Sequence, residues 1–368
     1  MSTEKAQKVA TALVARCSHM EITFVLASLG PAGGNRANLS LANELSKRGH
    51  KVKIISPIFP IPLKKREFLG RVKTALYRLL FHKYETRWMP TEIKGLNIER
   101  PLFLNAGMIG RTDVLIATFW FVAKALEDFR GPKFYIIGEI SETQEYREVL
   151  QSGRFLLITV SSTVKKYLEE KFSIKILGVV KNAVDTKIFY RENYRTEDNI
   201  TTIGMLYSPA VWKGSKYGFE AFEIVKERFS KIHLQLKLFG LTKKGIPKYA
   251  IFCKNPSPDE LRKIYNSIDI IVMPSLVELF PLIPLEAMAC GVPGVYTDVG
   301  GIREMVDDMR EGIIVPKGNS EAIADAVSLL IGNKELREQM SKNSLEKVKN
   351  FTWQKSAAEL ERIIRENI

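Results

Sequence analysis

Residues 274–293, PSLVELFPLIPLEAMACGVP, carry the most information about the fold. The apolar run at residues 268–273 in front of them predicts a buried strand, and residues 284–289 predict a helix. A strand, a short loop and a helix in this order are typical of a parallel α/β layer. The pattern places Glu278 at the end of the strand and Glu286 in the first turn of the helix, at the sheet edge where such folds bind ligands.

Strands and helices alternate on both sides of this stretch. One series runs from about residue 21 to the 180s, and a second begins near residue 199 and ends in three helices. Two similar α/β halves predict a cleft between them in which ligands bind. The predicted strands cover residues 22–26, 52–56, 113–117, 134–137 and 156–160 in the first half, and 201–205, 233–239, 268–273 and 295–297 in the second.

The composition narrows the functional classes. A chain of 368 residues is too long for one ordinary core, and 45% hydrophobic with 26% charged residues is typical of globular domains. The net charge of +14 favours an anionic partner, but no nucleic-acid-binding module is recognisable, so no nucleic acid is expected. Three scattered cysteines fit neither a disulfide framework nor a metal site and indicate the cytoplasm. The longest uncharged apolar run is about half a membrane span.

The chemistry of two carboxylates at this sheet edge suits a sugar ligand. Carboxylates accept paired hydrogen bonds from hydroxyl groups, so Glu278 and Glu286 could hold a ribose and a hexose. A simpler interpretation also exists, in which Glu286 is stabilised by the helix dipole and Glu278 is an ordinary surface residue. Two acids at this spacing do not by themselves decide between these interpretations.

The residues around the two acids give a more specific signal. The segment resembles the E-x7-E signature of the family 4 glycosyltransferases, a retaining family with the GT-B fold; Pro-Ser precedes it, and DVGGIRE follows at residues 298–304. The resemblance implies an α/β GT-B fold with two Rossmann-like domains whose parallel sheets face each other across a cleft. Residues 1–190 would form the acceptor-side domain, with a C-terminal helix at 353–368 packing back on it. Residues 191–352 would form the nucleotide-sugar-binding domain.

The same resemblance implies roles for individual residues. Glu286 would bind the nucleotide ribose, and Glu278 would be a catalytic residue that orients the donor sugar. The amides of Phe280 and Leu282 would contact sugar hydroxyls or the diphosphate, whereas Pro281 has no N–H. Leu279 stands where the family usually has glycine, which leaves the identity of the hexose open.

Lys213, in the sequence Trp212-Lys213-Gly214, is the second candidate catalytic residue. The family places a lysine before a glycine here, where its charge neutralises the donor diphosphate as the glycosidic bond breaks. The family often adds an arginine at the end of the preceding strand, but this chain has Met205 there. The alternative interpretation of Lys213 is a solvated loop lysine.

Four further candidate residues belong to the first half. Gly33 and Gly34 lie before a predicted helix at residues 35–48, where glycine lets the backbone approach the donor and helix amides attract phosphate. Glu139 and Glu142 follow a predicted strand on the acceptor side. They could contact the acceptor, and an exposed loop explains them equally well.

No metal or other cofactor is expected, and the nucleotide sugar is a substrate. The sequence contains no Asp-x-Asp motif, the usual carboxylate pair for a divalent metal in the other glycosyltransferase fold. Lys213, helix amides and loop amides would then stabilise the leaving diphosphate.

Residues 63–87 combine eight lysines and arginines with apolar residues at helical spacing. A basic amphipathic helix of this kind can rest on an anionic membrane surface and meet a lipid-linked acceptor, which would make the protein peripheral at the inner face of the membrane. A helix packed on the core with a charged outer face is an equal alternative.

The resemblance therefore implies transfer of a hexose from a UDP- or GDP-sugar to a hydroxyl acceptor, a glycan or a lipid-linked glycan, with retention of configuration. Two alternatives stay open. One is a catalytically inactive GT-B subunit that binds a nucleotide sugar, which Met205 and Leu279 would permit. The other is a GT-B sugar-nucleotide epimerase, although the extra carboxylates and histidines used by such enzymes are sparse here.

Overall fold

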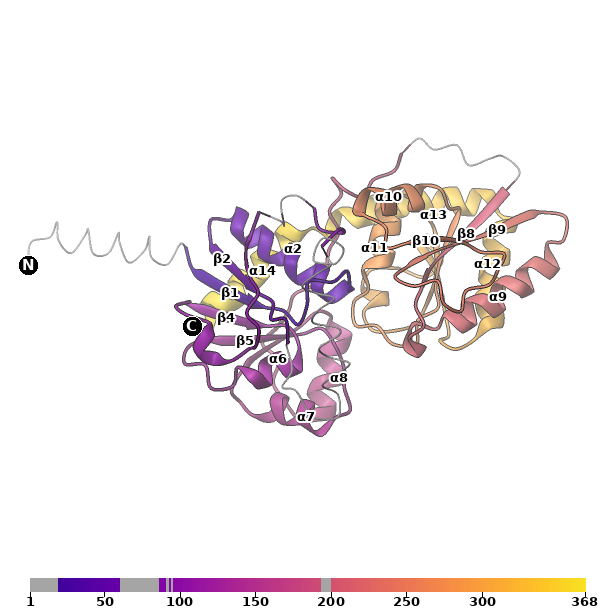
Figure 1. Cartoon of the computed structure of the whole chain (residues 1–368). Coiled ribbons are helices and arrows are strands. Elements are labelled where there is room, and N and C mark those ends of the chain that lie inside the picture. The colour runs from indigo at the N-terminus through magenta and orange to yellow at the C-terminus, as the bar shows by residue number, and fades with distance from the viewer. Residues whose placement is uncertain (1–18, 60–85, 91–92, 94, 193–199) are drawn as a thin grey trace, which may run out of the picture. The chain divides into compact units, whose positions relative to one another are not determined.

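The computed structural model describes residues 19–59, 86–90, 93, 95–192 and 200–368, and it contains two compact units (Figure 1). The first unit comprises the described residues up to Thr159, with Lys165–Val180 and Ala357–Ile368. The second comprises Val160–Val164 and Lys181–Ser356. The division lies at residue 180, ten residues before the predicted one. Residues 188–192 belong to the second unit because Arg262 and Asn266 of that unit hydrogen-bond to them.

The described residues of the first unit form a seven-stranded sheet in the order β3-β2-β1-β4-β5-β6-β7, and every strand pair is parallel. Helices connect the strands, and α14 (Trp353–Glu366) adds its residues from Ala357 onward. The strands are β1 (Glu21–Val25), β2 (Lys51–Ile55), β3 (Asn97–Glu99), β4 (Val114–Ala117), β5 (Lys133–Ile137), β6 (Leu156–Thr159) and β7 (Gly178–Val179), and the other helices are α2 (Gly33–Lys47), α6 (Trp120–Ala125), α7 (Gln144–Gln151) and α8 (Ser162–Phe172).

The second unit contains a six-stranded parallel sheet in the order β10-β9-β8-β11-β12-β13. Its strands are β8 (Ile200–Tyr207), β9 (His233–Gly240), β10 (Ile251–Lys254), β11 (Ile270–Met273), β12 (Gly294–Thr297) and β13 (Gly312–Val315). Its helices are α9 (Ser215–Arg228), α10 (Pro258–Asn266), α11 (Leu282–Ala289), α12 (Ser320–Gly332) and α13 (Lys334–Lys347).

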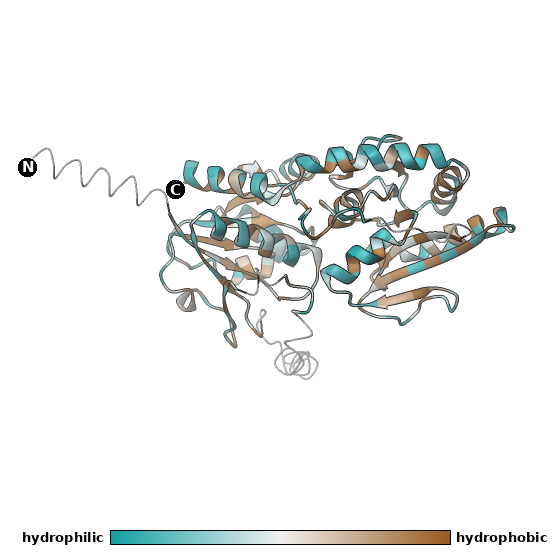
Figure 2. Cartoon of the chain, turned by 90° about the horizontal axis from the view of Figure 1, so that it is seen from above, coloured by the Kyte–Doolittle hydropathy of each residue, from teal (hydrophilic) through white to brown (hydrophobic). Residues whose placement is uncertain are grey.

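Burial explains why these segments form central strands. All four residues of β4, VLIA, and all four of β11, IIVM, are buried, as expected for parallel strands covered by helices on both faces. Figure 2 shows hydrophobic strands between helices that turn hydrophilic surfaces outward. Ser257 and Glu260 form a reciprocal capping box that starts α10 after the loop from β10.

The strand order creates a switch point in each sheet. In the first sheet β1 has β2 on one side and β4 on the other, and in the second sheet β8 lies between β9 and β11. The connections after the two central strands therefore leave in opposite directions and open a crevice at their carboxyl ends. In the second unit this crevice lies between the loop after β8 and the loop after β11.

The predicted α/β class with two parallel sheets is confirmed, and the differences lie at element ends. α2 begins at Gly33 instead of residue 35, so both glycines are helical, and α11 begins at Leu282 because the extended Pro281 is its N-cap. The edge strands β10 and β13 were not predicted. Of the basic segment predicted at residues 63–87, only residues 86 and 87 lie within the described part of the chain. Among the described residues, no helix has the length and apolar character needed to span a bilayer.

Candidate functional site

Lys213 and Glu278 form an ion pair at the switch point of the second sheet. Lys213 ends a short 3-10 helix, η3 (Val211–Lys213), that follows β8, and Glu278 lies in the loop that follows β11. The distance from Lys213 Nζ to Glu278 Oε1 is 2.6 Å. Ser275 Oγ donates a second hydrogen bond to the same carboxylate oxygen, at 2.9 Å. The structure thus brings together the two predicted catalytic residues.

The pair is shielded but accessible. The side chain of Lys213 is 27% exposed and that of Glu278 is 13% exposed. A charge pair at this depth is screened less by salt than one on the open surface. A ligand that carries both an anionic group and hydroxyl groups matches the two partners.

The backbone of the loop after β11 is fixed from two sides. The amides of Leu276 and Val277 donate to Trp212 O, which ties the loop to η3. From the other side, Thr297 Oγ1 donates to Ser275 O at 2.5 Å. The position of Ser275, and with it that of Glu278, therefore depends on β12 as well as on β11.

Two glycines allow the loop to approach its neighbours. Gly214 has φ +62°, and a Cβ at this position would lie 1.9 Å from Pro274 O. Gly300 has φ +52°, and its Cβ would lie 2.0 Å from Glu278 O. Both the left-handed backbone and the close contact exclude a side chain at these positions. Gly300 belongs to the DVGGIRE segment, so this motif holds the backbone of Glu278.

Glu286 lies in the same unit and makes a different contact. It is 2% exposed and lies in the second turn of α11, not in the first turn as predicted, because the helix begins at Leu282. Tyr265 Oη of α10 donates to Glu286 Oε2 at 2.8 Å. The first turn of α11 also supplies amide donors. Pro281 and Pro284 have no N–H, so Leu282 and Ile283 are the donors there.

Phe280 contributes to the site through its backbone. Its side chain is buried, and its carbonyl oxygen accepts a hydrogen bond from Asn182 Nδ2 at 2.7 Å. Asn182 belongs to the segment that enters the second unit, so that segment is anchored directly at the loop containing Glu278.

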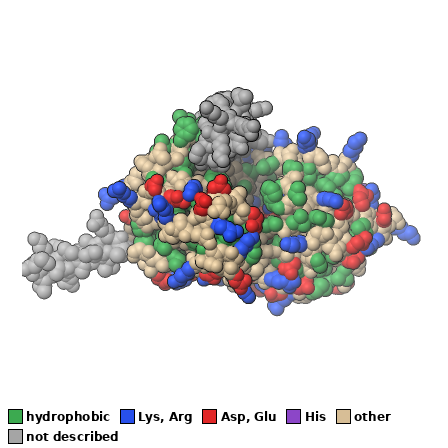
Figure 3. Space-filling view, turned by 90° about the horizontal axis from the view of Figure 1, so that it is seen from below, with side chains coloured by type: hydrophobic (Ala, Val, Ile, Leu, Met, Phe, Trp, Pro, Cys, Tyr) green, Lys and Arg blue, Asp and Glu red, His purple; other side chains and the backbone are tan. Residues whose placement is uncertain are grey.

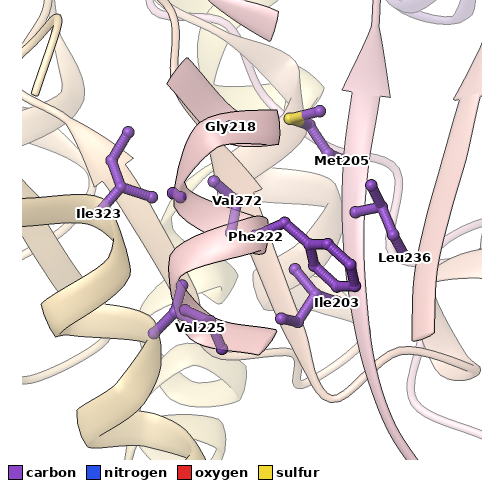
Figure 4. A pocket seen from close by; sticks show the side chains of 10 residues that line it. Ile203, Met205, Gly218, Phe222, Val225, Leu236, Val272 and Ile323 are labelled. Atoms are coloured by element: carbon purple, nitrogen blue, oxygen red, sulfur yellow. The ribbon is translucent and has the colours of Figure 1, made fainter. Parts of the chain in front are cut away.

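Met205 does not face the sheet edge. It is 1% exposed and lines a small apolar cavity under α9, beside Gly218 and Phe222 (Figure 4). The cavity is a gap in the core, lined by apolar residues of β8, β9, β11, α9 and α12. Lys216 is also turned to another partner, because its Nζ lies 3.6 Å from Glu220 Oε1. Met205 is uncharged and Lys216 pairs with Glu220, so neither residue supplies a second positive charge next to Lys213.

In the first unit, Gly33 and Gly34 form the first turn of α2. No side chain caps this turn, and a Cβ at Gly34 would meet no atom within 4 Å. The packing of the unit therefore does not itself require glycine at residue 34. The two glycines belong to the first unit, whereas Lys213 and Glu278 belong to the second.

Glu139 occupies the N-terminus of α6 in the first unit. Its Oε1 accepts a hydrogen bond from Trp120 N at 2.7 Å and another from Tyr135 Oη at 2.5 Å, while its Oε2 is enclosed without a partner among the described residues. Burial raises the pKa of Glu139 from 4.5 to about 7, and the two hydrogen bonds only partly oppose this. Glu139 is therefore a carboxyl group that can hold a proton near neutral pH.

This proton predicts a pH-dependent stability. Because folding raises the pKa of Glu139, its contribution to stability is full below about pH 4.5 and is lost as the pH rises through about 7. Glutamine keeps an acceptor for Trp120 and Tyr135 but cannot ionise. We expect the Tm of Glu139→Gln to rise relative to wild type between about pH 5 and about pH 8. The exposed Glu142→Gln is the control, and a Tm difference for Glu139→Gln that is constant across this range would contradict the assignment.

Glu142 differs from Glu139 in its surroundings. Its side chain is 69% exposed and pairs with Lys171 Nζ at 2.5 Å. The structure places it on the surface of the first unit, away from the enclosed carboxyl group of Glu139. Among the residues that the structure describes, no group of three or more His, Cys, Asp or Glu side chains is arranged to hold a metal ion.

A comparison with known proteins finds a family match in the second unit. Residues 187–347 match the family of glycosyl transferases group 1, and this range contains Lys213, Glu278 and Glu286. The matched range lies within the second unit. An uncharacterized glycosyltransferase of Methanocaldococcus jannaschii is 26% identical over 220 residues, which are 57% of this chain and 59% of that protein.

Another relative is similar over a shorter range. The D-inositol 3-phosphate glycosyltransferase of Paenarthrobacter aurescens is 40% identical over 99 residues, 27% of this chain and 24% of that protein. The matched region thus spans from about a quarter to less than two thirds of these relatives.

The fold of the whole chain is similar to a solved structure. HepE of Anabaena, solved in complex with UDP-glucose, has a TM-score of 0.67 over 93% of this chain and 99% of that one, at 16% sequence identity. HepE is a GT-B glycosyltransferase, so the two parallel sheets are those of the GT-B fold.

Several residues of the second unit were not found from the sequence. Ser275 and Thr297 fix the loop after β11, and Tyr265 holds Glu286, although 21 residues separate those two. Ser and Thr at strand ends are too common to stand out. Gly214 offered a usable signal, because a glycine next to the candidate lysine indicates a close backbone approach, whereas Gly300 lies 22 residues after Glu278.

Proposed function

We propose that this chain is a retaining glycosyltransferase that transfers a hexose from a UDP- or GDP-sugar to a hydroxyl group of a glycan or lipid-linked glycan. The Lys213–Glu278 pair at the switch point of the second sheet carries the proposal. A cation beside a carboxylate matches a donor in which an anionic diphosphate adjoins a sugar with several hydroxyl groups.

Each residue of the pair has a separate task. Lys213 binds the diphosphate and offsets the charge that grows on it as the glycosidic C–O bond breaks. Glu278 accepts hydrogen bonds from the hexose hydroxyls. Until donor binds, Glu278 neutralises Lys213, so the diphosphate replaces one anionic partner of the lysine with another.

Glu286 binds the ribose of the nucleotide. Its burial and the hydrogen bond from Tyr265 give the carboxylate one orientation, which a bidentate contact to two ribose hydroxyls needs. The amides of Leu282 and Ile283, at the N-terminus of α11, supply further donors for the diphosphate or the sugar. Together with Lys213 they offset the leaving charge, and we propose that the reaction needs no divalent ion.

The transfer step requires no protein base. The acceptor hydroxyl forms the new C–O bond on the face that the diphosphate leaves, and its proton passes to the departing phosphate oxygen. The nucleotide choice is supported by HepE, which was solved with UDP-glucose. We place the reaction in the cytoplasm, because the three cysteines are scattered along the sequence and the two that the structure describes, Cys253 and Cys290, are free.

A screen of donor hydrolysis with UDP-, GDP- and ADP-sugars tests the proposal. Release of nucleoside diphosphate from one donor class, increased by an added glycan acceptor, is the expected result. Nucleotide binding without turnover would instead identify a binding subunit. Interconversion of free sugar nucleotides would identify an epimerase.

Glu286→Gln should weaken the binding of the matching nucleoside diphosphate. Glutamine keeps the size of the side chain but removes a charge-assisted contact to the ribose, so we expect a loss of about tenfold or more in affinity. Isothermal titration calorimetry measures it, with the exposed Glu338→Gln as control. Unchanged affinity of Glu286→Gln would show that the ribose binds elsewhere.

A further inference from the structure

The edge of the second sheet carries an unusual distribution of charge. From Lys231 to Pro258 the chain contains six lysines and neither an aspartate nor a glutamate. This short stretch therefore holds +6 of a net charge of +14. None of these lysines takes part in the Lys213–Glu278 site, so the proposed transferase activity does not explain them.

Four exposed lysines of this stretch are interspersed along the chain with exposed apolar residues. We call Lys243, Lys244, Lys248 and Lys254, with Leu241, Tyr249 and Ile251, the lysine surface. All seven are exposed, and the apolar members are 58%, 43% and 44% exposed in the order given. Within the described part of the chain, these four lysines form no ion pair. Figure 3 shows basic, acidic and hydrophobic side chains interspersed over one face of the molecule.

The lysine surface is built on ordered backbone. It consists of the loop between β9 and β10 and of β10 itself, which is the edge strand of the sheet. Tyr207 Oη donates to Lys244 O at 2.5 Å, and the ring of Tyr249 stacks on Phe222 with 5.5 Å between centroids. Little conformational entropy of the backbone is lost when such a surface binds a partner.

Charged side chains of the neighbouring helix α9 lie next to the lysine surface. On α9, Lys226 Nζ lies 5.0 Å from the centre of the Tyr249 ring. The nearby carboxylate, Glu223, hydrogen-bonds to Tyr249 and pairs with Lys226 at 3.7 Å. The carboxylate beside Tyr249 is therefore neutralised, and Glu260 in the first turn of α10 is a further carboxylate close to Cys253 of β10.

We propose that the lysine surface docks on an anionic lipid bilayer. Lysines act as point charges suited to the diffuse field of anionic headgroups, and each one near such a surface strengthens binding by a factor of about five. Leu241 and Ile251 can enter the interfacial layer between the lysines. The stretch contains no arginine, the residue that best recognises phosphates and bases of nucleic acids, so a membrane fits better than RNA.

A lysine on an edge strand also discourages pairing with another sheet. That role accounts for Lys254, which lies in β10, but not for Lys243, Lys244 and Lys248, which lie in the loop before it. It also does not account for the exposed Leu241 and Ile251. A membrane contact accounts for both the charges and the apolar residues.

Co-sedimentation of the full chain with vesicles tests the docking. One set of vesicles is phosphatidylcholine, and the other is phosphatidylcholine mixed with phosphatidylglycerol. The test variant is Lys243→Glu with Lys248→Glu. The control, Lys334→Glu with Lys342→Glu, changes the net charge equally at exposed lysines of α13. We expect wild type and control to bind the anionic vesicles alike, and the test variant to bind at least tenfold more weakly.

Three results would overturn the proposal: no preference of wild type for anionic vesicles, equal losses in both variants, or full binding by the test variant. The last result would leave residues 63–87 as the membrane contact. Stronger binding of a single-stranded oligonucleotide than of vesicles, lost in the test variant, would point to nucleic acid instead. Leu241→Ser with Ile251→Ser should remove the part of vesicle binding that survives added salt, since salt screens only the lysines.

Discussion

Lys213→Ala should lower kcat by about a hundredfold to a thousandfold, the usual cost of removing one group that stabilises developing negative charge. The loss should appear mainly in kcat, because the charge on the diphosphate grows as the bond breaks and the lysine then matters most. Steady-state kinetics with the donor found in the screen would measure it.

Lys216→Ala is the matched control for this experiment. Lys216 lies three residues further along, is 77% exposed and pairs with Glu220, so its removal should leave kcat unchanged. Turnover of Lys213→Ala equal to that of wild type would remove Lys213 from the mechanism. An equal loss in both variants would indicate a general effect of positive charge.

Gly300→Ala should destabilise the second unit by about 3 kcal/mol and abolish transfer. The new Cβ would lie 2.0 Å from Glu278 O and 2.6 Å from Leu279 O, and backbone atoms cannot move aside as a flexible side chain can. The loop would shift and carry Glu278 away from Lys213. Urea unfolding followed by circular dichroism gives the stability, and the donor assay gives the activity.

Gly318→Ala separates the close contact from the backbone strain. Gly318 lies in the same unit with φ +72°, but the nearest atom to its Cβ would be 3.7 Å away. This variant should lose only the about 1–2 kcal/mol that a left-handed alanine costs. Equal destabilisation of the two variants would mean that strain alone, and not the contact with Glu278, explains the glycine at residue 300.

The sequence predicted the order of strands and helices well because local patterns determine it. Short runs of apolar residues such as 270–273 are typical of buried central strands. The candidate roles of Glu278 and Glu286 follow from the segment around them. The edge strands β10 and β13 were missed because each has only four residues, and β10 is in addition only partly buried. Gly33 was placed in a loop because glycine usually ends helices, whereas here the first turn of α2 has glycine at both of its first positions.

Contacts between distant segments could not be predicted from one sequence. The partner of Glu286 is a tyrosine on another helix, and the partner of Glu278 is a lysine 65 residues away. No local pattern signals which residues the fold brings together. The enclosed position of Glu139 was missed for the same reason, since it depends on Tyr135 and Trp120 from two other elements.

The assignment of residues 357–368 to the first unit affects how the protein is made. Ile363 and Leu360 are buried, and Glu361 pairs with Arg48 at 2.7 Å, so these residues complete the first unit. They leave the ribosome only after the whole second unit has been synthesised. The half of the protein that is translated first is therefore the half that finishes folding last, the reverse of the usual order in which domains mature during synthesis.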